Sequence, residues 1–297
     1  MKKSLFIIFA LATFNSNSQK ISVSETNEKF STGSHEAATT TIMEADLDNV
    51  IKEWKKLLKE FKYEKVKDDN NEVFGDNILI KDWGNNTADF YTKFEENKKA
   101  RTIKMSTAVD LGGAYLKSSG EHADKFKLVE KMTKEFAIKM TKGPIEEKLR
   151  DAEKAVTKLE DKQKDLEKDN KDLHQDIVDH NDKIAKSEKD LVAKEADIKK
   201  KKSEVDVQKK VVDASSGAVS EQAKSSKKIY DKLEGQLKDL ESDKKNLQND
   251  ISDYKEKIKK AEKDIKTNEE DQVKKKQEIE TAKKSRDEVK NKLDSIN

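Results

Sequence analysis

Residues 145–177 read IEEKLRDAEKAVTKLEDKQKDLEKDNKDLHQDI, and apolar residues recur three and four positions apart with charged residues between them. The same rhythm continues as far as Ile296. From Ile145 it keeps a seven-residue period for about ten heptads, whereas an ordinary amphipathic helix follows a period of 3.6 residues. This regularity predicts a coiled coil that takes up about half of the chain.

One break divides the repeat into two parts of similar length. Ser215, Ser216 and Gly217 stand in a stretch with few large apolar residues. A continuous helix would extend about 220 Å at 1.5 Å per residue, whereas two matched helices bury each other's apolar stripe. We therefore expect an antiparallel helical hairpin, with the continuous helix as the alternative. Its predicted parts are a first arm, a turn and a second arm, at residues 144–214, 215–217 and 218–297.

The predicted seam between the two arms is interrupted by polar residues. They stand where leucine would be most stable, at Gln163, Asn170, His180, Lys194 and Lys201. Polar seam residues lower the stability of a coiled coil and specify its register and partner. We expect an arm of modest stability that can exchange its seam with a partner, including a second copy of the chain. In the second arm, the spacing of Ile229, Leu233 and Leu237 predicts a stutter, and Val273 a further irregularity.

The N-terminus has the features of a secretory signal peptide. Two lysines precede the apolar run 5–12, and the small residues Ser16 and Ser18 follow it. The run is about ten residues long, whereas a membrane span needs about 20. We predict a signal peptide at 1–18, cleaved before Gln19, and a periplasmic or secreted protein without a transmembrane anchor. A retained anchor is the alternative.

The composition restricts the function. Charged residues make up 42% of the 297 residues and apolar residues 33%, which favours long helices over one large core. The 63 basic and 61 acidic residues nearly cancel, so no basic surplus indicates nucleic acid. The absence of cysteine excludes disulfides, thiolate metal sites and cysteine nucleophiles.

Between the signal and the coil, the sequence predicts a flexible linker at 19–42 and a small α+β head at 43–142. The linker prediction rests on its richness in Ser, Thr, Glu and Asn. In the head, an apolar stripe from Leu47 to Phe61 predicts a helix capped by Asp46 or Asp48. Three or four strands of an antiparallel meander follow, at 61–66, 73–83, 88–94 and 101–109. A second helix begins near Gly120, and Gly143-Pro144 is expected to end or kink it. The fold is mostly α overall.

The head offers few candidate functional residues. Trp83 and Tyr115 could line a groove for a ligand, while Gly112-Gly113 is expected to be a turn leaving the last strand. His174 and His180 are six residues apart and do not stack as helical metal ligands would. We expect no catalytic residues, no metal and no cofactor, because no nucleophile, base and orienting group occur together.

The segment Val109–Leu116, the helix from Phe126 to Met140 and the charged coil after it resemble uncharacterised secreted coiled-coil proteins of Bacteroidetes. The resemblance extends over residues 73–212, and Gln19 at the predicted mature N-terminus agrees with it. It implies secretion and carries no activity to this chain.

Together these features indicate a non-enzymatic secreted or periplasmic structural protein that acts through protein–protein interaction. Its head would dock to a partner protein, and its coiled-coil hairpin would be a spacer or oligomerisation arm. The main alternative is a periplasmic holdase chaperone that resembles the Skp type. A ligand-binding or enzymatic head is the third hypothesis.

Overall fold

The computed structural model describes residues 20–215 and 221–297. The predicted signal peptide at 1–18, and Ser216 and Gly217 of the predicted turn, lie outside the described residues. Contacts divide the chain into two compact units, which we call the head and the arm. The head comprises the described residues up to Val156 together with 281–297, and the arm comprises 157–280. Within the described ranges, no helix is long and apolar enough to cross a membrane.

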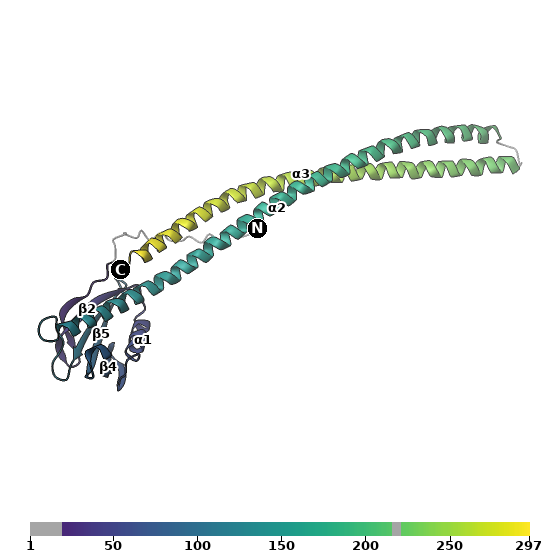
Figure 1. Ribbon diagram of the computed structural model, residues 1–297. Helices are drawn as coiled ribbons and strands as arrows, with labels where there is room; N and C mark the ends of the chain where they lie inside the picture. The colour runs from purple at the N-terminus through teal and green to yellow at the C-terminus, as the bar shows by residue number, and fades with distance from the viewer. Residues whose placement is uncertain (1–19, 216–220) are drawn as a thin grey trace. The chain divides into compact units, whose positions relative to one another are not determined.

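A sheet of six antiparallel strands forms the head, in the spatial order β1-β2-β6-β5-β4-β3 (Figure 1). The four strands from β3 to β6 form the predicted meander, but β3 begins four residues later than the strand predicted at 61–66 and overlaps it only at Lys65 and Val66. Two further strands, β1 and β2, extend the sheet beyond β6. The bounds are β1 Ser24–Phe30, β2 Gly33–Met43, β3 Lys65–Asp69, β4 Glu72–Leu79, β5 Thr87–Asn97 and β6 Thr102–Asp110.

The prediction of a flexible linker at 19–42 is wrong, because β1 and β2 occupy most of that segment. Apart from Ile42, the inward positions of β2 carry small residues and threonine. Ala38 is fully buried and Thr40 nearly so. Threonine favours strands, so the threonine run was a strand signal that its polarity concealed. The order of elements is therefore strands first, and the predicted first helix comes third.

One face of the sheet is covered by helices. Helix α1, Leu47–Leu58, connects β2 to β3, and the predicted cap Asp46 accepts a hydrogen bond from the Asn49 N–H at 2.9 Å. Its Trp54 is fully buried and meets Phe136 of the long helix α2 edge to face, with ring centroids 4.9 Å apart. A 3₁₀ turn at Lys81–Trp83 lies between β4 and β5. The large apolar cluster of the head fills this face.

Helix α2, Ala123–Ala214, passes through Gly143-Pro144 without ending, so the boundary predicted at 142–144 is wrong. Proline removes one backbone hydrogen bond and costs a helix interior about 3 kcal/mol. Met140 and Ile145 lie on either side of this point and are both buried in the apolar cluster. Packing against the head therefore holds the helix where its local sequence favours a stop.

Helix α3, Glu221–Asp294, returns the chain to the head. Ile296, just beyond it, is fully buried in the apolar cluster, and Leu293 packs against that cluster. The N–H of Ile21 donates to the carbonyl of Asn297 at 3.1 Å. The first described residues and the last ones therefore belong to the same core.

Glu44 joins three segments of the head. It follows β2 with a left-handed backbone, φ +56°, and its carboxylate pairs with Lys148 of α2 at 2.5 Å and with Lys292 of α3. Burial raises the pKa of Glu44, but hydrogen bonds and charge from the two lysines outweigh it and leave the pKa below 4.5. Ionised Glu44 therefore stabilises the attachment of both helices to the sheet.

Replacing Glu44 with Gln should lower the free energy of unfolding by about 2 kcal/mol, because the largely buried carboxylate loses its charge-assisted hydrogen bonds to Lys148 and Lys292. Folding lowers the pKa of Glu44, so its stabilisation is complete above the ordinary value of 4.5 and is lost as pH falls through the folded value. Urea unfolding between pH 3 and 7 should show a smaller acid loss in E44Q. The exposed Glu147→Gln is the matched control, and equal profiles for both variants would contradict this role.

Candidate functional site

The second face of the sheet carries a separate cluster that no helix covers. Side chains alternate between the faces of a strand, so Phe90 points into the helix-covered core and Tyr91 points to the other side. Phe30, Ala37 and Ala108 are buried on this second face, with Tyr91 and Tyr115 packed against them. Among the described residues, this cluster includes none from α1, α2 or α3. The head therefore has one closed face and one open face.

Five rings form a continuous row across the open face, which we call the aromatic row. Its members are Phe30, His35, Tyr115, Tyr91 and Phe74. Successive ring centroids are 6.2, 3.5, 6.2 and 4.9 Å apart. His35 and Tyr115 are parallel to within 7°. Lys67 of β3 lies 5.5 Å from the Phe74 ring centroid, at cation–π distance.

The loop after β6 places Tyr115 in the row. Asp110 accepts hydrogen bonds from the N–H groups of Gly112 and Gly113 at 3.0 and 2.7 Å, and both glycines have positive φ. This is the predicted turn, and it brings Tyr115 back beside Asp110. The hydroxyls of Tyr115 and Thr32 are 3.2 Å apart. Glycine is needed here because other residues resist this backbone conformation.

Carboxylates gather at one end of the aromatic row. Asp89 and Asp110 are directly opposite each other on β5 and β6, and Asp76 follows Phe74 on β4. Burial raises the pKa of Tyr91 to about 12, with further contributions from Tyr115 and the three aspartates. Burial and the charges of Asp89 and Glu64 also raise the pKa of Asp76. This end of the open face therefore carries an excess of negative charge next to aromatic rings.

The charges elsewhere on the open face neutralise one another. Lys104 pairs with Glu28 at 2.7 Å and with Glu95 at 3.3 Å, and Lys93 pairs with Glu95 at 3.0 Å. Hydrogen bonding to Glu28 is the largest influence on Lys104 and raises its pKa. Lys93 and Lys104 already have acidic partners. The end of the face with the aspartates is therefore the part that would attract a positively charged group.

The structure does not bring Trp83 and Tyr115 together, so the predicted groove between them is wrong. Trp83 is 8% exposed and stacks on Phe90 in the helix-covered core, with centroids 6.1 Å apart. Tyr115 belongs to the opposite face. The missed members of the row, Phe30 and His35, lay in the segment taken for a linker. One signal was available in the sequence. Phe90 and Tyr91 are adjacent in β5, and neighbouring side chains of a strand point to opposite faces, so both faces of the sheet carry an aromatic ring.

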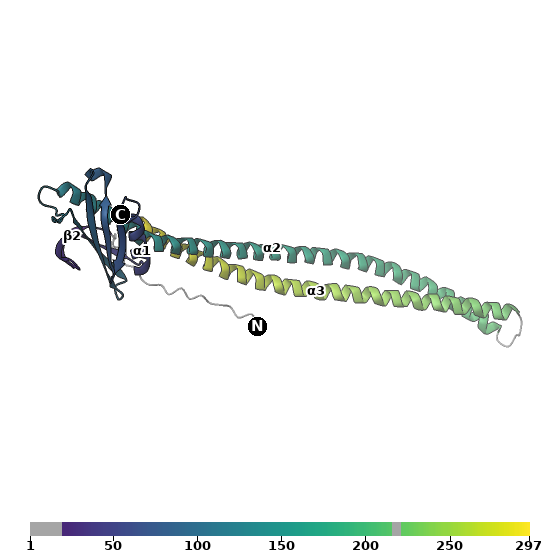
Figure 2. The same ribbon diagram turned by 90° about the horizontal axis from the view of Figure 1, so that it is seen from below.

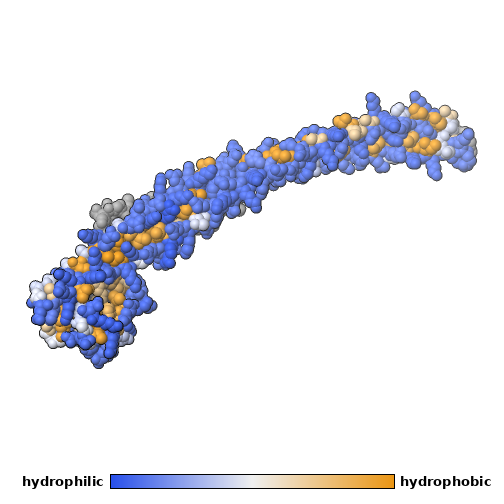
Figure 3. Space-filling view, in the orientation of Figure 1, coloured by the Kyte–Doolittle hydropathy of each residue, from blue (hydrophilic) through white to orange (hydrophobic). Residues whose placement is uncertain are grey.

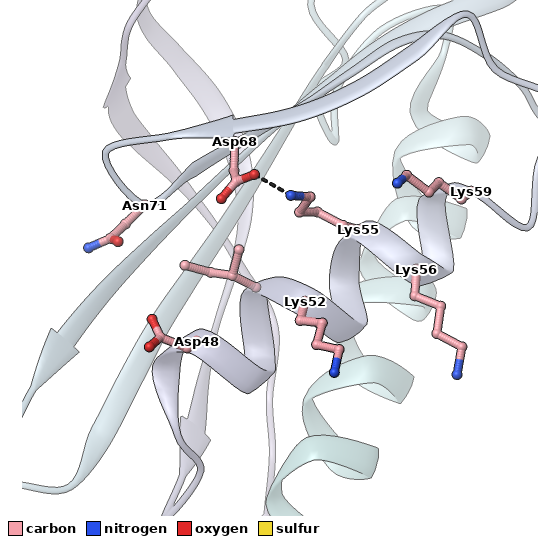
Figure 4. A pocket seen from close by; sticks show the side chains of 8 residues that line it. Asp48, Lys52, Lys55, Lys56, Lys59, Asp68 and Asn71 are labelled. Atoms are coloured by element: carbon pink, nitrogen blue, oxygen red, sulfur yellow. Dashed lines mark hydrogen bonds and ion pairs between the residues drawn. The ribbon is translucent and has the colours of Figure 1, made fainter.

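A shallow hollow of about 570 Å³ lies on the outside of the head between α1 and β3 (Figure 4). Lys55 reaches across to Asp68 and pairs with it, whereas Lys52 and Lys56 point away from Asp68. The ammonium groups therefore do not converge on one ligand position. The lining residues are Asp48, Ile51, Lys52, Lys55, Lys56, Lys59, Asp68 and Asn71.

In the arm, α2 and α3 run antiparallel, and the predicted polar seam residues lie between them. Gln163 contacts Gln272 at 3.4 Å, Lys194 pairs with Asp243 at 3.1 Å, and Lys201 donates to Gln236 at 3.2 Å. The His180 ring stacks on Tyr254 with centroids 5.6 Å apart. Asn170 is half-buried. From one pair to the next, the α3 residue moves back along the chain by about as many positions as the α2 residue moves forward. A single antiparallel register therefore holds along the arm.

The predicted stutter near Leu233 and the irregularity near Val273 are both wrong. Ile229 and Val273 are 48% and 58% exposed, so neither belongs to the seam. Their neighbours Tyr230 and Gln272 occupy the half-buried positions, and the three- and four-residue alternation of burial runs through both places. The sequence had suggested breaks because Ile229 and Val273 are apolar but face outward.

Three polar atoms of the seam are buried without a hydrogen-bond partner: Gln163 Oε1, Asn170 Nδ2 and His180 Nδ1. Each such atom costs about 1–3 kcal/mol relative to a satisfied one. Ser215 ends α2 and bonds to the carbonyls of Val211 and Val212 through its hydroxyl, at 3.0 Å. The seam thus specifies a register at a cost in stability.

No group of three or more His, Asp or Glu residues is placed to hold a metal ion within the ranges that the structure describes. No protein-family model, curated protein or solved structure matches this chain. The open face and its aromatic row are therefore the candidate functional site on geometry alone.

The Tyr91 phenol should ionise at about pH 12, whereas an unperturbed tyrosine ionises near pH 10. The difference in ultraviolet titration between the native chain and Tyr91→Phe isolates this residue. A midpoint near 10 in that difference spectrum would show that Tyr91 is neither buried nor surrounded by carboxylates.

Replacing Asn170 with Leu should raise the free energy of unfolding by about 1–2 kcal/mol, because a buried amide without a partner gives way to an apolar side chain. Asn181→Leu is the matched control, since Asn181 is exposed on the same helix. Urea unfolding at fixed protein concentration measures both. Equal or opposite changes would show that Asn170 carries no desolvation penalty.

Proposed function

We propose that this chain is a non-enzymatic docking protein, secreted or periplasmic, whose head binds a partner protein through the open face of its sheet. The observation that carries the proposal is the aromatic row, to which no described helix contributes, beside Asp76, Asp89 and Asp110. Aromatic residues are enriched where protein interfaces bury most of their area. A sheet face that served only stability would be expected to be polar throughout.

The charges favour a cationic partner surface. Around Asp76, the carboxylates of Asp89 and Glu64 oppose ionisation, while Lys65 and Lys67 favour it. With Asp110, four carboxylates thus face two lysines at this end of the row. Arginine is the best match, because its guanidinium stacks on aromatic rings and binds carboxylates with two parallel hydrogen bonds.

The arm completes the proposal as a coiled-coil spacer. Its half-buried seam alternates in three- and four-residue steps and is laid out in one register. About 60 residues in each helix would separate the two ends of the arm by roughly 90 Å. The arm surface shown in Figure 3 is mostly hydrophilic, as expected for a solvated rod.

The proposal is tested by affinity capture with the full chain as bait. Asp76→Asn with Asp89→Asn removes the charge without disturbing the rings, and Phe74→Ser with Tyr91→Ser removes the rings. Both double variants should lose a basic partner that the native chain retains, by about tenfold or more in recovered amount. Circular dichroism establishes that each variant is folded.

Leu128→Ser is the control, because Leu128 is an exposed apolar residue of α2 in the head. It should capture the partner as the native chain does. Partner recovery that is the same in the native chain and in both double variants would refute docking at the open face. Loss in the aromatic variant alone would refute the cationic character of the partner.

A further inference from the structure

Four valines of α2 in the arm lie outside the seam and are exposed: Val178, Val192, Val207 and Val211. Of these, Val178 and Val192 share a heptad position. Val178 is 52% and Val192 68% exposed, although their neighbours Ile177 and Leu191 are half-buried seam residues. Isolated hydrophobic residues also stand out on the mostly hydrophilic arm in Figure 3. The two valines are two heptads apart, and the exposed Ala185 stands midway between them.

These three residues share one face of α2. At about 100° per residue, Ala185 is rotated about 20° from Val178, and Val192 about 40°. Along the helix axis, this face therefore has a small residue, Ala185, with one valine seven residues before it and one seven residues after it. The order of residue types is the same in both directions. A small residue at the centre allows a second helix to approach to about 8 Å.

Two charged residues lie on one flank of this face, at nearly equal distances from Ala185 along the helix. Asp182 is three residues before Ala185 and Lys189 four residues after it, and both are exposed. Within the described part of the chain, neither side chain has a hydrogen bond or ion pair. By contrast, Glu188 and Glu195 on the adjoining flank already pair with Lys255 and Lys244 of α3.

We propose that a second copy of this chain packs antiparallel on this face, with the two-fold axis at Ala185. Val178 of each copy then meets Val192 of the other, and Asp182 of each lies beside Lys189 of the other. A two-fold interface requires a surface that is complementary to itself, and this combination satisfies that requirement in both apolar pattern and charge. The two seams between α2 and α3 remain intact.

The contact is small, so the dimer is weak and concentration-dependent. Two heptads of each helix bury less than the roughly 1,200 Å² that is typical of a stable interface. The proposal adds a bivalent arrangement to the docking role but does not depend on it. Head variants that abolish partner capture should leave self-association unchanged.

A single cysteine tests the axis, because the native chain has none. Ala185→Cys places the two thiols at the axis, where a disulfide needs Cα atoms within about 7 Å. Ala196→Cys is the matched control, exposed on α2 but 11 residues from the axis, which separates its two thiols by about 33 Å. In the full-length chain, A185C should form covalent dimers at least about tenfold faster under mild oxidation.

Equal crosslinking of both variants, or none from A185C, would overturn the proposal. Circular dichroism shows whether both variants keep the native helix content. Since both positions are exposed, neither substitution should disturb the fold.

A charge exchange tests the register independently. Asp182→Lys should raise the dimer dissociation constant about tenfold, because lysines then face each other at two symmetric positions. Adding Lys189→Asp should restore the native value, as measured by sedimentation equilibrium. A double variant that stays as weak as Asp182→Lys would refute the pairing of Asp182 with Lys189.

Discussion

The helix-covered face of the sheet is the constraint on which the rest of the head depends. Six antiparallel strands present one strongly apolar face, and α1 alone does not supply all of the side chains that cover it. The beginning of α2 and the residues after α3 supply the remainder, including Phe136 and Ile296. Both long helices are therefore anchored in the same core as the sheet. Glu44 adds a polar tie, since it binds a lysine from each helix.

The arm follows a different principle from the head. The pairing register of its two helices is specified by polar residues that lie between them. Its stability comes from the apolar residues that stand between these polar positions along the seam. Lys194 and Lys201 are accommodated in the seam because each donates a hydrogen bond to an acceptor on α3 at the same register. Gln163, Asn170 and His180 leave atoms without partners. Such a seam favours one alignment over its shifted alternatives, because a shift would separate the matched polar partners.

The open face of the sheet connects the fold with the proposed docking role. A twisted antiparallel sheet can leave one face to water when that face is polar. Here the face instead carries rings in contact with one another, and burial, with smaller contributions from Tyr115 and nearby carboxylates, raises the pKa of Tyr91. The exposed valines of the arm are a second such departure from a polar surface. Both are places where packing within the described chain is incomplete.

The arm was the easiest part to predict, because burial there depends on spacing along one helix. Each seam position assigned from Ile145 to Val212 is buried or half-buried. In the head, the strands β4, β5 and β6 were predicted because their apolar residues alternate. The strands β1 and β2 were missed because β1 is mostly polar and β2 carries mainly alanine and threonine. The pairing of β2 is also with a strand about 65 residues away in sequence.

By itself, therefore, the sequence determined the helical hairpin, its polar seam, the first helix with its cap and the central meander. These features depend on contacts between neighbours or on a fixed period. Only the tertiary structure decided that the N-terminal strands complete the sheet, that α2 continues through Pro144 and that Ile296 closes the core. It also separated Trp83 from Tyr115 and assembled the aromatic row. Each of these depends on which face of an element meets a distant segment, and that choice is made by packing rather than by local preference.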